Sequence, residues 1–173
     1  MAQHLELHRT WSGIVYRGTR TEFAGDDDFL SGDGSLFHGG RWNAPEVCRA
    51  VYTSLEHTTV VEEASAGARQ FGILDALPMT IRAVRCGLHL VVDFTTEAAP
   101  AALALDLAAV MAEEWRARNR EGSEALSQAL GYACDSVGLE GMVVPSALGS
   151  SSNLVIFPDN LKRHSRLTLD PRR

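Results

Sequence analysis

The residues best suited to chemistry in this 173-residue chain are Arg17, Arg41, Tyr52, Glu63 and the serines of the loop at 146–152. A guanidinium group offers five fixed N–H donors in a plane that matches phosphate oxygens, and it keeps its charge at neutral pH. A tyrosine ring can stack on a flat ligand while its hydroxyl keeps a polar partner. A carboxylate in a cleft can stabilise positive charge that develops on a sugar. These residue types predict a site for an anionic ligand with a flat ring, such as a nucleotide.

The segment 31–54, SGDGSLFHGGRWNAPEVCRAVYTS, carries two of these candidates. Its first half holds four glycines, which disfavour a helix and predict a loop whose backbone can approach a ligand closely. Arg41 and Trp42 follow the paired glycines Gly39 and Gly40 directly. A turn signal at 43–45 then leads into a β-prone segment that places Tyr52 on a strand.

This segment also carries a family resemblance. The motif GGRWN-x-P, followed by VYTS and by a glutamate eleven residues beyond Tyr52, resembles the RES domain, a family of bacterial toxins. The likeness runs from about Tyr16 to Pro158. It implies an ADP-ribosyltransferase-like fold and NAD as the substrate. The family's arginine pair falls on Arg17 and Arg41, and its tyrosine and glutamate fall on Tyr52 and Glu63.

The resemblance also assigns residues near the C-terminal end. The family's serine best matches Ser146, with the serines at 150–152 as alternatives, and an asparagine that the family often has matches Asn153. Catalytic roles are expected for Glu63, Arg41, Tyr52 and Ser146. Contacts with NAD are expected for Arg17, Gly39, Gly40, Trp42 and Asn153, although packing is the stronger alternative for Trp42. The Asp26–Asp28 insertion lengthens the usual spacing between the two arginines.

The resemblance implies the toxin of a type II toxin–antitoxin system, which cleaves the nicotinamide–ribose bond of NAD and depletes the cell of it. The acceptor of ADP-ribose would be water or phosphate, and nicotinamide leaves as a neutral molecule, so no general acid is required. Transfer to a host protein is an alternative that uses the same residues. A non-catalytic NAD sensor is a second alternative, weakened by Glu63 because an anionic ligand needs no carboxylate beside it. The implied partner is a cognate antitoxin, Xre-like and DNA-binding.

Helical phase distinguishes Glu63 from its neighbour Glu62. Residues 58–71 read as a helix, in which steps of 100° place Val60, Ala64, Gly67 and Phe71 on one apolar stripe. Glu63 falls at the edge of this stripe and can point into a cleft. Glu62 falls on the opposite side, toward solvent.

The other expected elements give the fold class. A short strand at 13–18 ends near Arg17, residues 22–28 read as a solvated loop, and strands at 80–86 and 89–94 read as a hairpin that turns at Gly87. One long helix is expected from Pro100 through Arg118, and a second after Ser123 with Leu126, Leu130, Ala133 and Val137 on its buried face. Strands are expected at 141–145 and 153–157. This order predicts a single α+β domain over 1–173, with a mostly antiparallel sheet, a core at about 13–158, a short lead-in and a basic tail or edge element.

Composition narrows the function classes. The net charge of −6 and pI near 5.5 argue against a nucleic-acid-binding surface. The three cysteines form no CxxC or Cys/His cluster, so neither a disulfide framework nor a metal site is predicted. No apolar run approaches the roughly 18 residues that cross a bilayer, and a cytoplasmic protein is expected. The sequence contains no GxGxxG, P-loop, GxSxG or HExxH motif.

Overall fold

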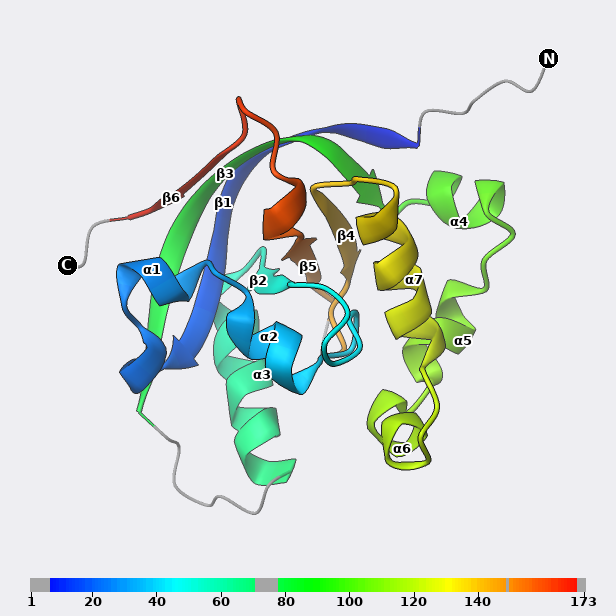
Figure 1. Ribbon diagram of the computed structural model, residues 1–173, viewed down its shortest axis with the longest axis horizontal. Helices are drawn as coiled ribbons and strands as arrows, with labels where there is room; N and C mark the ends of the chain where they lie inside the picture. The colour runs from blue at the N-terminus through cyan, green and yellow to red at the C-terminus, as the bar shows by residue number, and fades with distance from the viewer. Residues whose placement is uncertain (1–6, 71–77, 149, 171–173) are drawn as a thin grey trace.

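The computed structural model describes residues 7–70, 78–148 and 150–170. Its strands are β1 (His8–Arg20), β2 (Val51–Ser54), β3 (Met79–Asp93), β4 (Gly141–Pro145), β5 (Ser152–Ile156) and β6 (Arg166–Leu169). The sheet order is β1-β2-β5-β4-β3-β6, and an additional pairing of β1 with β3 closes the first five strands into a ring (Figure 1). Only β3 and β4 pair in parallel among the described strands. The predicted α+β class with a mostly antiparallel sheet is therefore confirmed.

Strands β1 and β3 form a long antiparallel ribbon, and here two predictions were wrong. Strand β1 begins at His8, within the predicted lead-in, and extends well beyond the predicted 13–18. Strand β3 continues through Gly87 instead of turning there. Gly87 pairs with Ser12 of β1 on one side and with Arg166 of β6 on the other. These long-range partners satisfy the backbone groups of β3, so a single glycine does not end the strand.

The helices are η1 (Thr21–Phe23), α1 (Asp26–Phe29), α2 (Asp33–His38), α3 (His57–Gln70), α4 (Ala98–Ala102), α5 (Leu107–Ala112), α6 (Trp115–Arg120), α7 (Leu126–Ser136) and η2 (Pro158–Asn160). Helices α4–α7 lie together on the right of Figure 1, whereas α1–α3 lie at the left and lower centre. The central strands β2, β4 and β5 lie between the two groups. None of the helices within the described ranges is long and apolar enough to span a membrane.

The glycine-rich segment is only partly a loop, which corrects the sequence-based expectation. It contains helix α2, preceded by Gly32 with a φ of 76° and followed by Gly39 with a φ of 70°. Both glycines have a positive φ, which disfavours other residues, and they mark the start and the end of the helix. The hydroxyl of Ser35 donates to the Gly32 carbonyl at 2.8 Å and accepts from the Ala50 N–H at 2.8 Å, which ties α2 to the start of β2.

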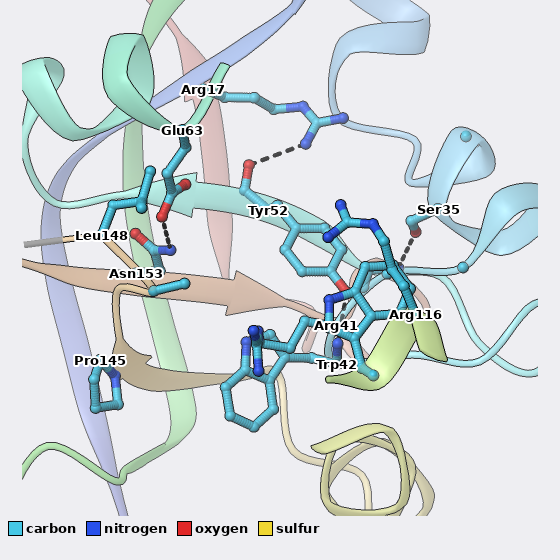
Figure 2. A pocket seen from close by; sticks show the side chains of 16 residues that line it. Arg17, Ser35, Arg41, Trp42, Tyr52, Glu63, Arg116, Pro145, Leu148 and Asn153 are labelled. Atoms are coloured by element: carbon cyan, nitrogen blue, oxygen red, sulfur yellow. Dashed lines mark hydrogen bonds between the residues drawn. The ribbon is translucent and has the colours of Figure 1, made fainter. Parts of the chain in front are cut away.

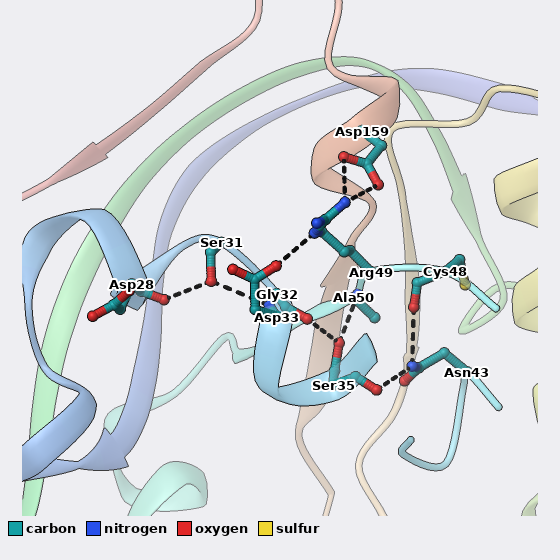
Figure 3. A network of polar contacts seen from close by, with 10 residues as sticks. All are labelled: Asp28, Ser31, Gly32, Asp33, Ser35, Asn43, Cys48, Arg49, Ala50 and Asp159. Atoms are coloured by element: carbon teal, nitrogen blue, oxygen red, sulfur yellow. Dashed lines mark hydrogen bonds and ion pairs between the residues drawn. The ribbon is translucent and has the colours of Figure 1, made fainter. Parts of the chain in front are cut away.

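A polar network secures the segment between α2 and β2 (Figure 3). Arg49 bridges Asp33 of α2, at 2.7 Å, and Asp159 of η2, at 3.2 Å. Below it, the fully buried Asn43 donates from its amide to the carbonyls of Ser35, at 2.8 Å, and Cys48, at 3.1 Å. The motif asparagine therefore fixes the backbone turn that carries Arg41 and Trp42 toward the sheet.

The long helix expected over 100–118 is replaced by three short ones, α4, α5 and α6. Ala104 has a φ of 49°, which no right-handed helix accommodates. Asp106 then starts α5, because its carboxylate accepts from the Ala109 N–H at 3.0 Å. Glu113 is extended and separates α5 from α6. The side chain of Asp106 therefore starts a new helix at a point where the apolar periodicity alone predicts one continuous helix.

Helix α7 buries a different face from the one predicted. Leu126 and Val137, both expected in the core, are 55% and 74% exposed. The buried residues are Ser127, Gln128, Gly131 and Cys134. An ideal Cβ on Gly131 would lie 1.8 Å from the carbonyl oxygen of Trp42, so only glycine allows this close approach. Contact with the backbone at Trp42, rather than apolar content, sets the orientation of α7.

The core consists of two clusters separated by the wall of the ring. One contains Val15, Val51, Val84, Val143 and Leu154, one residue from each of the five ring strands, and so fills the ring's interior. The other lies between the outside of the ring and α5 and α7. Alternation along β5 places Leu154 and Ile156 in the first cluster and Val155 in the second.

Candidate functional site

A cavity of about 520 Å³ brings together the predicted residues from distant parts of the chain (Figure 2). Its lining includes Arg17 of β1, the residues after α2, Tyr52 of β2, Glu63 of α3, residues of α6, and Asn153 of β5. Of the nine residues predicted for the site, all but Ser146 line this cavity: Arg17, Gly39, Gly40, Arg41, Trp42, Tyr52, Glu63 and Asn153. Ser146 reaches it through a hydrogen bond to Glu63.

Glu63 is held by two donors that converge on one oxygen. Its Oε1 accepts from the Ser146 hydroxyl at 2.7 Å and from the Asn153 amide at 2.8 Å. Each donor is itself fixed: the Leu148 N–H donates to the Ser146 hydroxyl at 3.1 Å, and the Ser54 hydroxyl donates to Asn153 Oδ1 at 2.8 Å. The carboxylate is therefore oriented before any ligand arrives, which is what electrostatic stabilisation of a cationic sugar requires.

The predicted positions of Val60, Glu62 and Glu63 on helix α3 are confirmed, whereas Val61, expected beside the apolar stripe, is 44% exposed. Val60 is 7% exposed, Glu62 is exposed and Glu63 is half-buried at the cavity. The helix begins at His57, one residue from the predicted start. The remaining stripe positions, 64, 67 and 71, lie outside the described side chains.

Tyr52 is partly buried, and its hydroxyl is used by the protein itself. The hydroxyl accepts from the Trp42 N–H at 2.9 Å and donates to Asn43 Oδ1 at 2.7 Å. Burial raises the pKa of Tyr52 well above its usual value, so the group stays neutral. An ideal Cβ on Gly40 would lie 2.3 Å from the Tyr52 hydroxyl oxygen. The second motif glycine is thus required by the protein's own tyrosine, whose ring faces the cavity.

Gln128 of α7 is a positioning residue that the sequence analysis missed. It is fully buried and donates from its amide to the Gly40 carbonyl at 3.0 Å and to Asn119 Oδ1 at 2.8 Å. It therefore holds the backbone directly before Arg41. The predicted phase of α7 placed Gln128 away from the buried face. A glycine inside a helix often marks a close contact, so Gly131, three residues later, was the signal for the face that is buried.

Arg17 is fixed from two sides. Its Nε donates to the Phe29 carbonyl at 2.7 Å and its Nη1 donates to the Tyr52 carbonyl at 3.0 Å. Burial lowers the pKa of Arg17 to about 10, and the guanidinium stays charged at neutral pH. Phe29 is fully buried at the end of α1. The insertion at 26–28, read from the sequence as part of a solvated loop, therefore belongs to a short helix that anchors the first arginine.

Arg41 connects the motif to the helical side of the cavity. Its Nη1 donates to the Met111 carbonyl at 3.2 Å and to the Glu113 carbonyl at 3.4 Å. Burial is the main cause that lowers the pKa of Arg41, and the charge of Glu114 opposes that shift. The carbonyls come from the end of α5 and the residue that follows it, so Arg41 also fixes the segment that leads into α6.

Two residues of α6, Trp115 and Arg116, line the cavity although sequence reasoning gave them no role in it. The guanidinium of Arg116 lies 4.3 Å from the centre of the Trp115 ring. Both residues were expected within one long helix, but the extended Glu113 breaks that helix and α6 then begins at Trp115. An adjacent Trp–Arg pair, the reverse of Arg41–Trp42, was the available signal.

Trp42 has both a packing position and a place in the cavity lining. It is 2% exposed and belongs to the outer core cluster. Gly39 has a positive φ, and an ideal Cβ there would lie 2.8 Å from Pro45 Cδ.

Within the described residues no group of three His, Cys, Asp or Glu side chains is placed to hold a metal ion.

Comparison with known proteins relates this geometry to a family. The RES domain model matches residues 14–171. Proteins named NAD(+) phosphorylase MbcT, from Mycobacterium tuberculosis and Mycobacterium bovis, are 30% identical over 158 residues, which cover 86% of this chain and 76% of the relative. The crystal structure of the M. tuberculosis MbcT–MbcA toxin–antitoxin complex matches with a TM-score of 0.70 at 26% identity, covering 95% of this chain and 84% of that one. The chain belongs to the RES domain family, as its motifs indicate.

Proposed function

We propose that this protein is the toxin of a toxin–antitoxin pair and that it cleaves the nicotinamide–ribose bond of NAD, with inorganic phosphate as the acceptor. The observation that carries the proposal is the oriented carboxylate of Glu63, held by Ser146 and Asn153 in a cavity that also presents arginines. The relatives named NAD(+) phosphorylase support both the substrate and the acceptor. The fold's relation to ADP-ribosyltransferases is part of this proposal, supported by a mostly antiparallel sheet whose strands supply Arg17, Tyr52 and Asn153.

The chemistry follows from the charges in the cavity. When the bond between the ribose C1″ and the nicotinamide nitrogen breaks, its electron pair goes to the ring, and nicotinamide leaves as a neutral molecule. Positive charge develops on the sugar, and the Glu63 carboxylate stabilises it. A phosphate oxygen then forms a bond to C1″, which gives ADP-ribose-1″-phosphate. Arginines offer the donors that bind the diphosphate of NAD.

Product analysis tests the reaction. Purified protein with NAD and phosphate is expected to release nicotinamide and ADP-ribose-1″-phosphate, which mass spectrometry distinguishes from other products. Free ADP-ribose in the presence of phosphate would mean that water is the acceptor, and a mass increase of a protein would mean transfer to protein. Unchanged NAD under all conditions would overturn the proposed function.

The proposal includes a cognate antitoxin, of the Xre-like, DNA-binding type. The solved relative was crystallised with its antitoxin, and a protein that consumes NAD inside a cell harms that cell unless it is blocked. Expression of the chain alone in bacteria is expected to arrest growth and lower cellular NAD, whereas the Glu63→Gln variant is expected to do neither. Normal growth with abundant folded wild-type protein would count against the toxin assignment.

A further inference from the structure

We propose that Arg116 forms, together with Arg41, the subsite for the diphosphate of the substrate, and that Trp115 holds Arg116 in place for this purpose. The identity of the substrate rests on the proposed function. The assignment of Arg116 to an anion rests on the geometry of the cavity and is tested separately below.

Two positive charges, Arg41 and Arg116, face one cavity, and the charge of Glu114 acts on both of them. Both Arg41 and Arg116 line it, and the charge of Arg116 helps to lower the pKa of Arg41, after the larger effect of burial. Among the described residues, neither guanidinium forms an ion pair with a carboxylate. On the same helix, Arg118 pairs with Glu113 at 3.2 Å. Like charges in a partly desolvated cavity repel, and a bound dianion removes that cost.

The three arginines of the cavity differ in how many of their N–H groups the protein itself uses. Arg17 uses Nε and Nη1 on the carbonyls of Phe29 and Tyr52. Arg41 uses Nη1 on two carbonyls of the helical side. Arg116 makes no hydrogen bond to any residue within the described ranges, so it can offer two parallel N–H groups to phosphate oxygens. Such bidentate contacts are the strong form of arginine–phosphate recognition.

Arg116 is held in place by its neighbour before any ligand binds. Its guanidinium lies 4.3 Å from the Trp115 ring centre, a stacking contact that fixes the plane of the fork. Arg41 donates to the carbonyls of Met111 and Glu113, immediately before this Trp–Arg pair. The two arginines are thereby connected through a single short segment, and little side-chain entropy is lost when they bind one ligand.

The position in the cavity selects the diphosphate over the acceptor phosphate. In Figure 2, Glu63 and Asn153 lie on one side of Tyr52, whereas Arg41 and Arg116 lie on the other. The acceptor has to reach C1″ beside Glu63. The diphosphate lies one ribose away from that carbon, toward the adenosine. A dianion bound between Arg41 and Arg116 therefore corresponds to the diphosphate.

The test compares Arg116→Gln with Arg118→Gln, a matched control on the same helix outside the cavity lining. Calorimetry with ADP measures diphosphate binding without any reaction, and kinetics give kcat and the KM for NAD and for phosphate. Arg116→Gln is expected to weaken ADP binding and to raise the KM for NAD by about tenfold each, equivalent to about 1.4 kcal/mol. We expect kcat and the KM for phosphate to change by less than about threefold. Arg118→Gln is expected to leave all four quantities unchanged.

A double variant tests whether the two arginines act on one group. If Arg41 and Arg116 share the diphosphate, the effects of Arg41→Lys and Arg116→Gln on ADP affinity are expected to be non-additive. If Arg116→Gln does not fold, Arg116→Lys replaces it in the test. Lysine keeps the positive charge but lacks the two parallel N–H groups, so ADP binding is expected to weaken by a smaller factor.

The results that overturn the inference are equally specific. Unchanged ADP affinity in folded Arg116→Gln removes the subsite. A raised KM for phosphate with unchanged ADP affinity assigns Arg116 to the acceptor instead. If the wild-type protein binds ADP but leaves NAD intact, the proposed function fails while the test of Arg116 stands.

Discussion

Replacing Glu63 by Gln is expected to lower NAD turnover by a factor on the order of 10²–10³, the usual cost of removing one well-placed electrostatic group. The substitution keeps the shape of the side chain and removes the charge that would stabilise a cationic ribose. The donors on Ser146 and Asn153 can still bind the amide oxygen, so the loop and β5 keep their places. ADP affinity is expected to persist, because the arginines remain. Single-turnover kinetics with NAD, alongside calorimetry with ADP, measure the two effects separately.

Glu62→Gln is the matched control for this prediction. Glu62 is the preceding residue on α3, carries the same charge and is exposed to solvent. Its substitution is expected to change stability by less than about 0.5 kcal/mol and to leave the turnover rate unchanged. Loss of turnover in Glu62→Gln with full activity in Glu63→Gln would show that the two carboxylates have been assigned the wrong way round. Full activity in both variants would remove the carboxylate from the mechanism.

Among glycine-to-alanine substitutions in the described part of the chain, Gly131→Ala is expected to be the most destabilising. An ideal Cβ would lie 1.8 Å from the backbone oxygen of Trp42, and a backbone atom cannot move aside without its loop. Alanine gains about 1 kcal/mol of helix propensity over glycine. Overpacking of a tight contact costs roughly 1–3 kcal/mol and occasionally more, and a contact this short lies at the upper end. The net result is a lower Tm in calorimetry, together with weaker ADP binding, because Gln128 and Trp42 shift with the contact.

Gly34→Ala provides the opposite control. Gly34 lies inside α2, and an added Cβ would meet no atom within 4 Å. Here the propensity gain is unopposed, and the free energy of unfolding is expected to rise by about 0.5–1 kcal/mol. A Tm for Gly131→Ala equal to or above that of the wild-type protein, as is expected for Gly34→Ala, would show that the α7 contact is not tight.

Sequence patterns located the elements whose signals are local. Helix α3 and strands β4 and β5 follow directly from periodicity and composition, and they carry Glu63, Ser146 and Asn153 to the cavity. The family motif brought together residues that no local pattern connects. It gave Arg17 and Tyr52 as members of one site, and the structure places both at that cavity.

Features that depend on distant contacts could not be predicted in this way. The orientation of α7 follows from the approach of Gly131 to Trp42, which apolar periodicity does not encode. The break before α6 follows from a cap at Asp106 and an extended Glu113. Without that break, Arg116 lies inside the single helix predicted from Pro100 through Arg118. Continuity of β3 through Gly87 likewise depends on partner strands far away in the sequence.

The closed ring has a consequence for when this protein can act during its synthesis. The two donors to Glu63 come from beyond β4 and from β5, and Asn153 follows Glu63 by 90 residues. At roughly 5–20 residues per second, a ribosome needs about 5–18 s to cover that interval. Until then the nascent chain has Arg17, Arg41 and Glu63 but lacks at least one of the two donors that orient the carboxylate. On the proposed function, the chain is therefore inactive throughout most of its translation and becomes active only when β5 pairs within the sheet. This delay gives a co-produced inhibitor time to fold before the toxin is active.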